Sequence, residues 1–215
     1  MMMKPLVLAL ALASALCAAT AASAQAVPPS TASCLTADEA QLAALANQYR
    51  QQNGVAPVAV SFSMSSVAQW HVWDLVANDP VGGACNLHSW SNARPGQWTA
   101  VCYTADHAQA TQMWNKPTQI SSGAYTAPGY EIAAGSGGTI TPALAMSLWQ
   151  NSSAHNDVLL NRGIWASHPF RAMGVGMFQG FAVIWFGEVT DPLGTMAPCS
   201  AGGGVDRLFA NGFEG

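Results

Sequence analysis

Trp149-Gln150-Asn151-Ser152-Ser153-Ala154-His155-Asn156-Asp157-Val158-Leu159-Leu160 is the stretch that decides the fold, because it holds one histidine in a polar segment between two apolar anchors. Upstream, Thr141-Pro142 followed by apolar residues up to Leu148 predicts an N-cap, a proline in the first turn and a helix with a buried stripe. We expect this helix to bring Trp149 into the core and to hold His155 just past its end.

Two other segments also place a titratable group between apolar residues. They are Leu87-His88-Ser89-Trp90 and Tyr130-Glu131-Ile132-Ala133. A carboxylate in a short apolar run is expected to be partly buried, and a buried carboxylate needs a partner. Because the chain has only five histidines, we expect His88 and His155 to lie within contact distance of Glu131 in one cleft.

His71 lies on the apolar side of a helix predicted from about Met64 to Ala77, three residues before Asp74. A histidine in this position is more often a packed residue whose ring nitrogen bonds a carboxylate or a carbonyl than a metal ligand. We therefore predict a packing role for His71 and leave it out of the site.

The remaining pattern predicts helices packed against a small antiparallel sheet. The first helix is expected to start at Thr36, with Glu39 completing a capping box, and to end at Asn53-Gly54. A further helical piece is expected at residues 106–114, with an exposed His107 in its first turn. Strands at 173–177 and 181–189 form a predicted hairpin. The predicted fold class is α+β.

Five motifs in this order resemble segments of the CAP superfamily, which comprises cysteine-rich secretory proteins, antigen 5 and plant pathogenesis-related proteins. The resemblance covers residues 35–191. The motifs are Asn47-x-x-Arg50 with Gly54, Ala68-x-x-His71-x-x-Asp74, Gly129-Tyr130-Glu131-Ile132-Ala133 beside the family's G-E-N-(I/L)-A, Trp149-x-x-Ser152-x-x-His155 with Val158-Leu159-Leu160, and the hairpin from Met173 to Phe186.

The resemblance implies a three-layer α-β-α sandwich and a secreted cavity protein. Members are linked to sterol or lipid binding, to a divalent metal at a His pair, and to host or microbial interaction. The family tetrad of two His and two Glu is matched here by His88, Glu131 and His155. Ser152 stands where many members carry the second Glu, and the insertion at 91–128 is longer than usual.

Three functions remain open on this basis. The first is a binding and interaction module, with a lipid or other small-molecule ligand, an extracellular protein or cell-wall partner, and a zinc-like ion bound weakly by His88, Glu131 and His155. The second is a metal-dependent hydrolase acting on peptide or cell-wall material through Glu131 and His155. The third is a purely structural domain. A serine nucleophile at Ser152 or Ser153 beside His155 is a weaker alternative.

The chain divides into a secretory signal at 1–24, a leader at 25–34, the CAP-like domain at 35–199, and a Gly-rich linker and short tail at 200–215. We therefore expect a secreted, extracellular or periplasmic protein. Beyond the signal no apolar run reaches about 18 residues, so no membrane span is predicted. Only 8% of residues are charged and nothing basic is clustered, which disfavours nucleic acid as a partner.

Four cysteines remain after the signal, which predicts two disulfides with three possible pairings. We favour Cys85–Cys102, which closes a loop that carries His88, and Cys34–Cys199, which joins the two ends of the domain. A zinc–cysteine site is the rival, although the chain has no C-x-x-C pair. Trp90, Trp98 and Trp114 are either core residues, which we favour, or a carbohydrate platform.

Overall fold

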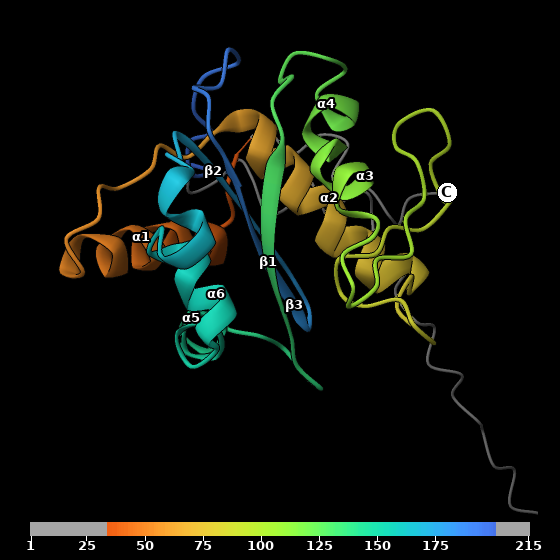
Figure 1. Ribbon diagram of the computed structural model, residues 1–215, viewed down its shortest axis with the longest axis horizontal. Coiled ribbons are helices and arrows are strands. Elements are labelled where there is room, and N and C mark those ends of the chain that lie inside the picture. Colours follow the sequence, from red (N-terminus) through yellow and green to blue (C-terminus); the bar gives the residue numbers. More distant parts are fainter. Residues whose placement is uncertain (1–33, 201–215) are drawn as a thin grey trace, which may run out of the picture.

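The computed structural model describes residues 34–200. The predicted signal at 1–24, all but the last residue of the leader, and the tail from residue 201 onward lie outside the described residues. Figure 1 shows a central sheet with α1, α5 and α6 on one face and α2, α3 and α4 on the other. The described chain therefore has the predicted α+β class and the three layers.

The sheet has three antiparallel strands in the order β1-β3-β2. They are β1 (Gly129–Gly135), β2 (Ala172–Phe178) and β3 (Phe181–Gly187). Residues Gln179 and Gly180 join β2 to β3, with Gln179 at a φ of 49°, so the predicted hairpin is confirmed. In this register Glu131 lies opposite Trp185, and Trp185 lies opposite Gly174.

The two long helices begin and end close to their predicted positions. Helix α1 (Ala37–Gln52) has Thr36 as N-cap, and the capping box with Glu39 is present. Helix α2 (Phe62–Asn78) begins two residues earlier than predicted, because the Ser61 hydroxyl accepts from the Met64 amide and caps the helix there. Helix α5 (Pro142–Gln150) starts after Thr141 as expected, and Trp149 is fully buried.

The short helices differ from the prediction in three ways: one is shorter than expected, and two were not predicted. The helical piece expected at 106–114 is shorter, because Asp106 accepts from the Ala108 amide and holds this segment in a turn. His107, at a φ of 59°, is exposed as predicted but lies before α3 (Ala110–Trp114). Helix α4 (Lys116–Ile120) was not predicted. His155 lies inside a short helix, α6 (Ser153–Leu159), which is followed by a 3₁₀ turn, Gly163–Ser167.

Helix α2 packs directly on the sheet because two glycines leave room for its backbone. A Cβ at Gly174 would lie within 1.9 Å of the Met64 backbone, and one at Gly176 within 2.4 Å of the Ala68 backbone. No side chain larger than hydrogen fits at either position without moving the helix. This close approach packs α2 on β2 and β3, and it lets His71 reach Glu131 of β1.

Both favoured disulfides, Cys34–Cys199 and Cys85–Cys102, are present. Trp90 and Trp98 are buried core residues, as predicted, whereas Trp114 is only half-buried. Across residues 34–200, no helix combines the length and the apolar character that a membrane crossing requires.

Candidate functional site

Glu131 lies in β1, on the face covered by α2. Its side chain is fully buried and both carboxylate oxygens face imidazoles, since Oε1 lies 2.5 Å from Nδ1 of His71 and Oε2 lies 2.7 Å from Nδ1 of His88. Burial raises the pKa of a carboxyl, but the two histidines outweigh burial, and the pKa of Glu131 lies below its usual value. Glu131 is therefore a carboxylate shared by two histidines.

His71 comes from α2 and is also fully buried. Its Nε2 lies 3.0 Å from the carbonyl oxygen of Ser89, and its ring stacks on Trp90 with centroids 4.3 Å apart. A carbonyl only accepts, so Nε2 must carry a hydrogen and donate. One further proton is then held between Nδ1 and the carboxylate of Glu131. The predicted packing role of His71 is confirmed, with a carboxylate and a carbonyl as its two partners.

His88 comes from the segment enclosed by the Cys85–Cys102 disulfide. Its side chain is 20% exposed. Because Nδ1 faces a carboxylate, it donates, and the neutral ring then carries its lone pair on Nε2. The loop beyond His88 is fixed by α2, where the Asp74 carboxylate accepts from the Ser91 amide at 2.7 Å and His71 donates to Ser89. The motif that carries His71 and Asp74 thus holds the segment that presents His88.

His155 lies on α6 and is half-buried. Burial lowers the pKa of His155, and any positive charge on the nearby His88 would lower it further, which favours a neutral imidazole at pH 7. Helix α6 is fixed by α1, since Arg50 Nη1 donates to the Leu159 carbonyl at 2.6 Å and the Tyr49 hydroxyl donates to Asn156 at 3.0 Å. The Arg50 of the first family-like motif therefore holds the helix that carries His155.

The structure brings Glu131 and His88 into contact as predicted. His155 lies close enough to His88 for a charge on His88 to affect the pKa of His155. Within residues 34–200, no group of three or more His, Cys, Asp and Glu side chains is arranged to hold a metal ion. Both oxygens of Glu131 bond imidazole nitrogens, so in this arrangement the carboxylate faces the two histidines. The expected metal site at His88, Glu131 and His155 stays a prediction.

The residue that sequence reasoning left out of the site is His71. The signal that could have included it was the matched motif Ala68-x-x-His71-x-x-Asp74, which puts a histidine and a carboxylate one turn apart on the buried face of α2. That signal gave the packing role correctly. It did not reveal that the packing partner of His71 is Glu131, because the two residues are 60 positions apart.

A second His–Glu pair lies on the opposite face of β1. His168 Nδ1 lies 2.5 Å from Oε1 of Glu188, and the Tyr130 hydroxyl donates to the same oxygen at 2.9 Å. The hydrogen bond from His168 keeps the pKa of Glu188 below its usual value. Burial, together with Glu188, raises the pKa of Tyr130 to about 12. No sequence argument pointed to this pair.

Three solved bacterial structures are similar to the chain. An extracellular protein containing an SCP domain from Bacillus anthracis has a TM-score of 0.49 at 18% identity, over 71% of this chain and 40% of its own. A cysteine-rich secretory protein from Staphylococcus aureus has a TM-score of 0.45 at 13% identity. The match covers 71% of this chain and 38% of that protein. An outer surface protein of Borrelia burgdorferi has a TM-score of 0.45 at 15% identity. The match covers 70% of this chain and 92% of that protein.

This chain spans less than half the length of the Bacillus anthracis and Staphylococcus aureus proteins. No family model matches the sequence, and no curated protein matches it significantly.

Proposed function

We propose that this protein is an exported, disulfide-stabilised binding domain of the SCP class, and that its His88–His155 pair binds a zinc-like divalent ion. The observation that carries the proposal is the carboxylate of Glu131, which bonds Nδ1 of His88. A carboxylate on one ring nitrogen fixes the tautomer and makes the other nitrogen a better metal ligand. Two disulfides in the described domain are typical of proteins that leave the reducing cytosol.

The donor set fits such an ion in part. His88 and His155 would each supply a neutral imidazole nitrogen, and imidazole suits zinc-like ions better than calcium or magnesium. Glu131 would not be a ligand; it would accept the hydrogen bond from Nδ1 of His88 and so orient the His88 ring. A bound ion would offer a Lewis-acid centre with positions left for water or for a donor group of a ligand. Two protein ligands support only modest affinity.

We also propose a ligand for this site, from the classes that the family resemblance implies. A lipid or other small molecule that carries a carboxylate, phosphate or hydroxyl donor would complete the coordination of an ion at His88 and His155. The pocket of about 130 Å³ beside Tyr49 and Met146 is below the roughly 300 Å³ of ordinary small-molecule sites, so it does not support a sterol there. Interaction with an extracellular protein or the cell wall remains part of the proposal.

The hydrolase alternative gains no support from the arrangement of Glu131. A general base must reach the proton of an attacking water, and both oxygens of Glu131 are bonded to buried or half-buried imidazoles. Ser152 precedes α6, and its side chain makes no capping bond. We therefore place a binding role before a hydrolytic one.

Calorimetric titration of the metal-free protein with Zn²⁺ at pH 7.5 and pH 5.5 tests the proposal. Protons compete for the same lone pairs, so affinity should fall as the pH drops below about 6.5. Because the pKa of His155 is lowered, its share of the loss should come at the acidic end of that range. His88→Ala and His155→Ala should each weaken binding at least about tenfold.

The matched control is His168→Ala, which removes a partly exposed histidine of the other His–Glu pair. It should leave zinc binding unchanged. Binding that survives in both His88→Ala and His155→Ala, or that is equally tight at pH 5.5, would show that this pair does not hold the ion.

A further inference from the structure

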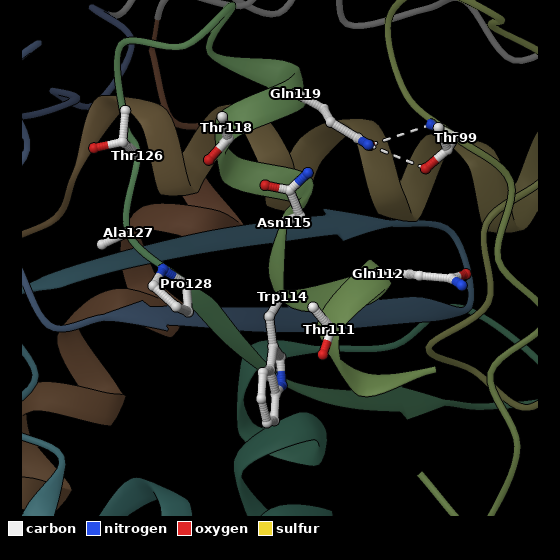
Figure 2. Close-up of a pocket in the computed structure, with 10 residues that line it drawn as sticks. All are labelled: Thr99, Thr111, Gln112, Trp114, Asn115, Thr118, Gln119, Thr126, Ala127 and Pro128. Carbon is white, nitrogen blue, oxygen red and sulfur yellow. Dashed lines mark hydrogen bonds between the residues drawn. The ribbon is translucent and has the colours of Figure 1, made fainter. Parts of the chain in front are cut away.

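A pocket of about 330 Å³ lies away from the histidine cluster, between α3, α4 and the segment that leads into β1 (Figure 2). Its walls come from the insertion that is longer than usual for the family-like pattern. Its volume lies at the lower end of the range of small-molecule sites, which begins at about 300 Å³. The pocket is therefore large enough for a ligand of one or two small rings.

The lining of this pocket is polar but uncharged. Seven of its ten lining residues carry a hydroxyl or an amide, and none is Asp, Glu, Lys, Arg or His. Five of these polar side chains line the pocket and do not take part in the bonds that hold its wall: Thr111, Gln112, Asn115, Thr118 and Thr126. Amides and hydroxyls both donate and accept, so this set matches a ligand whose groups do the same.

Trp114 supplies an aromatic surface at one end of the pocket (Figure 2). Its ring is half-buried and is held edge-to-face against Tyr130, with centroids 5.5 Å apart and an interplanar angle of 71°. This contact fixes the indole before any ligand arrives. An indole fixed in this way offers apolar contact area at little cost in side-chain entropy.

The opposite wall is fixed by a buried lysine. Lys116 is fully buried, and its Nζ donates to the Thr99 carbonyl and to Oε1 of Gln119. Gln119 in turn donates from Nε2 to the Thr99 hydroxyl at 3.0 Å, a bond drawn in Figure 2. Burial lowers the pKa of Lys116 to about 8. The ammonium thus orders the wall from inside, and the pocket itself presents no charged side chain.

From this lining we propose that the pocket binds a neutral saccharide, one or two pyranose rings at a time. A pyranose has an apolar C–H face, which matches the indole of Trp114 and the threonine methyl groups. It also has hydroxyls around its rim, which match the free amides of Gln112 and Asn115. An acidic or basic ligand would find no counter-charge here, and a lipid chain would leave most of the polar lining unpaired.

Saturation-transfer NMR with four neutral oligosaccharides (cellotriose, maltotriose, mannotriose and tri-N-acetylchitotriose) tests the proposal on the mature protein. At least one should receive saturation at its ring C–H protons. Trp114→Leu should weaken binding more than tenfold. Asn115→Ala and Gln112→Ala should each weaken it about threefold to tenfold, the size of one net hydrogen bond. Circular dichroism checks that each variant is folded.

Two controls separate this pocket from the rest of the molecule. Gln51→Ala removes an exposed glutamine of α1, and His88→Ala alters the histidine cluster. Both should bind saccharide like the unaltered protein, so failure of the zinc proposal leaves this one intact. If Trp114→Leu is unfolded, Gln112→Ala and Asn115→Ala decide the outcome.

The proposal is overturned if no neutral saccharide binds. It is also overturned if all three pocket variants bind as well as the unaltered protein. Preferential binding of trigalacturonate or of laurate, competing at the same variants, would replace it with an acidic saccharide or a lipid.

Discussion

Two His–Glu pairs flank the same strand, and they differ in burial. The Glu131 side chain is fully buried, whereas the Glu188 side chain is 34% exposed. Both carboxyl pKa values are below their usual value, because in each pair an imidazole bonds the carboxylate. The difference lies in what happens when a partner is lost, since water can solvate Glu188 but not Glu131. The same chemical pair is thus an internal structural unit in one place and a surface contact in the other.

Strand alternation produces this difference from two adjacent residues. Tyr130 and Glu131 follow each other in β1, so their side chains point to opposite faces of the sheet. Tyr130 reaches Glu188 within the aromatic group of Trp165 and Phe170, while Glu131 reaches the histidines under α2. One segment of sequence therefore supplies both sites, and a shift by one residue would exchange them.

The largest expected effect is that of Glu131→Gln. An amide removes the negative charge that faces the proton held between Nδ1 of His71 and Glu131. The buried His71 must then either keep a charge without a counter-charge or give up that proton, and in both cases the buried ion pair is lost. Breaking a buried charged pair in this way costs about 3 to 5 kcal/mol. Urea unfolding at pH 7 measures the change in the free energy of unfolding.

Glu188→Gln is the matched substitution in the exposed pair. It should cost less than about 1 kcal/mol, because surface ion pairs contribute little. Equal costs for the two variants would show that burial does not separate the two pairs.

The second prediction concerns the disulfide that encloses His88. Cys85→Ser combined with Cys102→Ser opens a loop with a sequence separation of 17 residues. Losing a disulfide that closes a loop of this length should lower the free energy of unfolding by about 3 kcal/mol. Freed from the disulfide, the segment should also present His88 less well, so zinc binding should weaken while the His168–Glu188 pair is unaffected.

NMR titration of the histidine ring protons separates these two effects. Changes at His88 with none at His168 are expected. A uniform change at both histidines would contradict a local role for the disulfide.

The fold was largely predictable because its signals are local. The Thr36 capping box, Thr141-Pro142 at α5 and the Gln179-Gly180 hairpin each depend on residues within a few positions of one another. The turn before α3 is held by a local bond, from the Ala108 amide to Asp106, and the helix expected there was assigned too early in the sequence. Helix α4 was missed because a bond that holds it, from Lys116 to Thr99, joins residues 17 positions apart. Propensity alone does not report such tertiary contacts.

The site was predictable in its members but not in its bonding. Apolar flanks correctly indicated that Glu131 is buried and that it needs a histidine partner. They could not show that the second partner beside His88 is His71 and not the expected His155, because the close approach of α2 at Gly174 and Gly176 decides which histidine reaches the carboxylate. The His168–Glu188 pair was missed because its residues lie in an ordinary turn and at a strand end.

The smallest expected effect is the pH dependence of the exposed pair. The folded-state pKa of Glu188 is depressed, so between that value and the usual value of about 4.5 the unfolded chain binds more protons than the folded one. The contribution of Glu188 is therefore fully present above pH 4.5 and is lost as the pH falls through the folded-state pKa. The difference in unfolding free energy between the unaltered protein and Glu188→Gln should start below about 1 kcal/mol at pH 6 and become smaller as the pH falls below 4.5. Urea unfolding at pH 6, 4.5 and 3.5 measures this difference, and 1 M NaCl at pH 6 should reduce it because exposed charges are screened.

Tyr130→Phe is the control for the hydrogen bond from the tyrosine hydroxyl to Glu188. A difference that stays constant from pH 6 to 3.5 would mean that Glu188 contributes through packing and not through its charge.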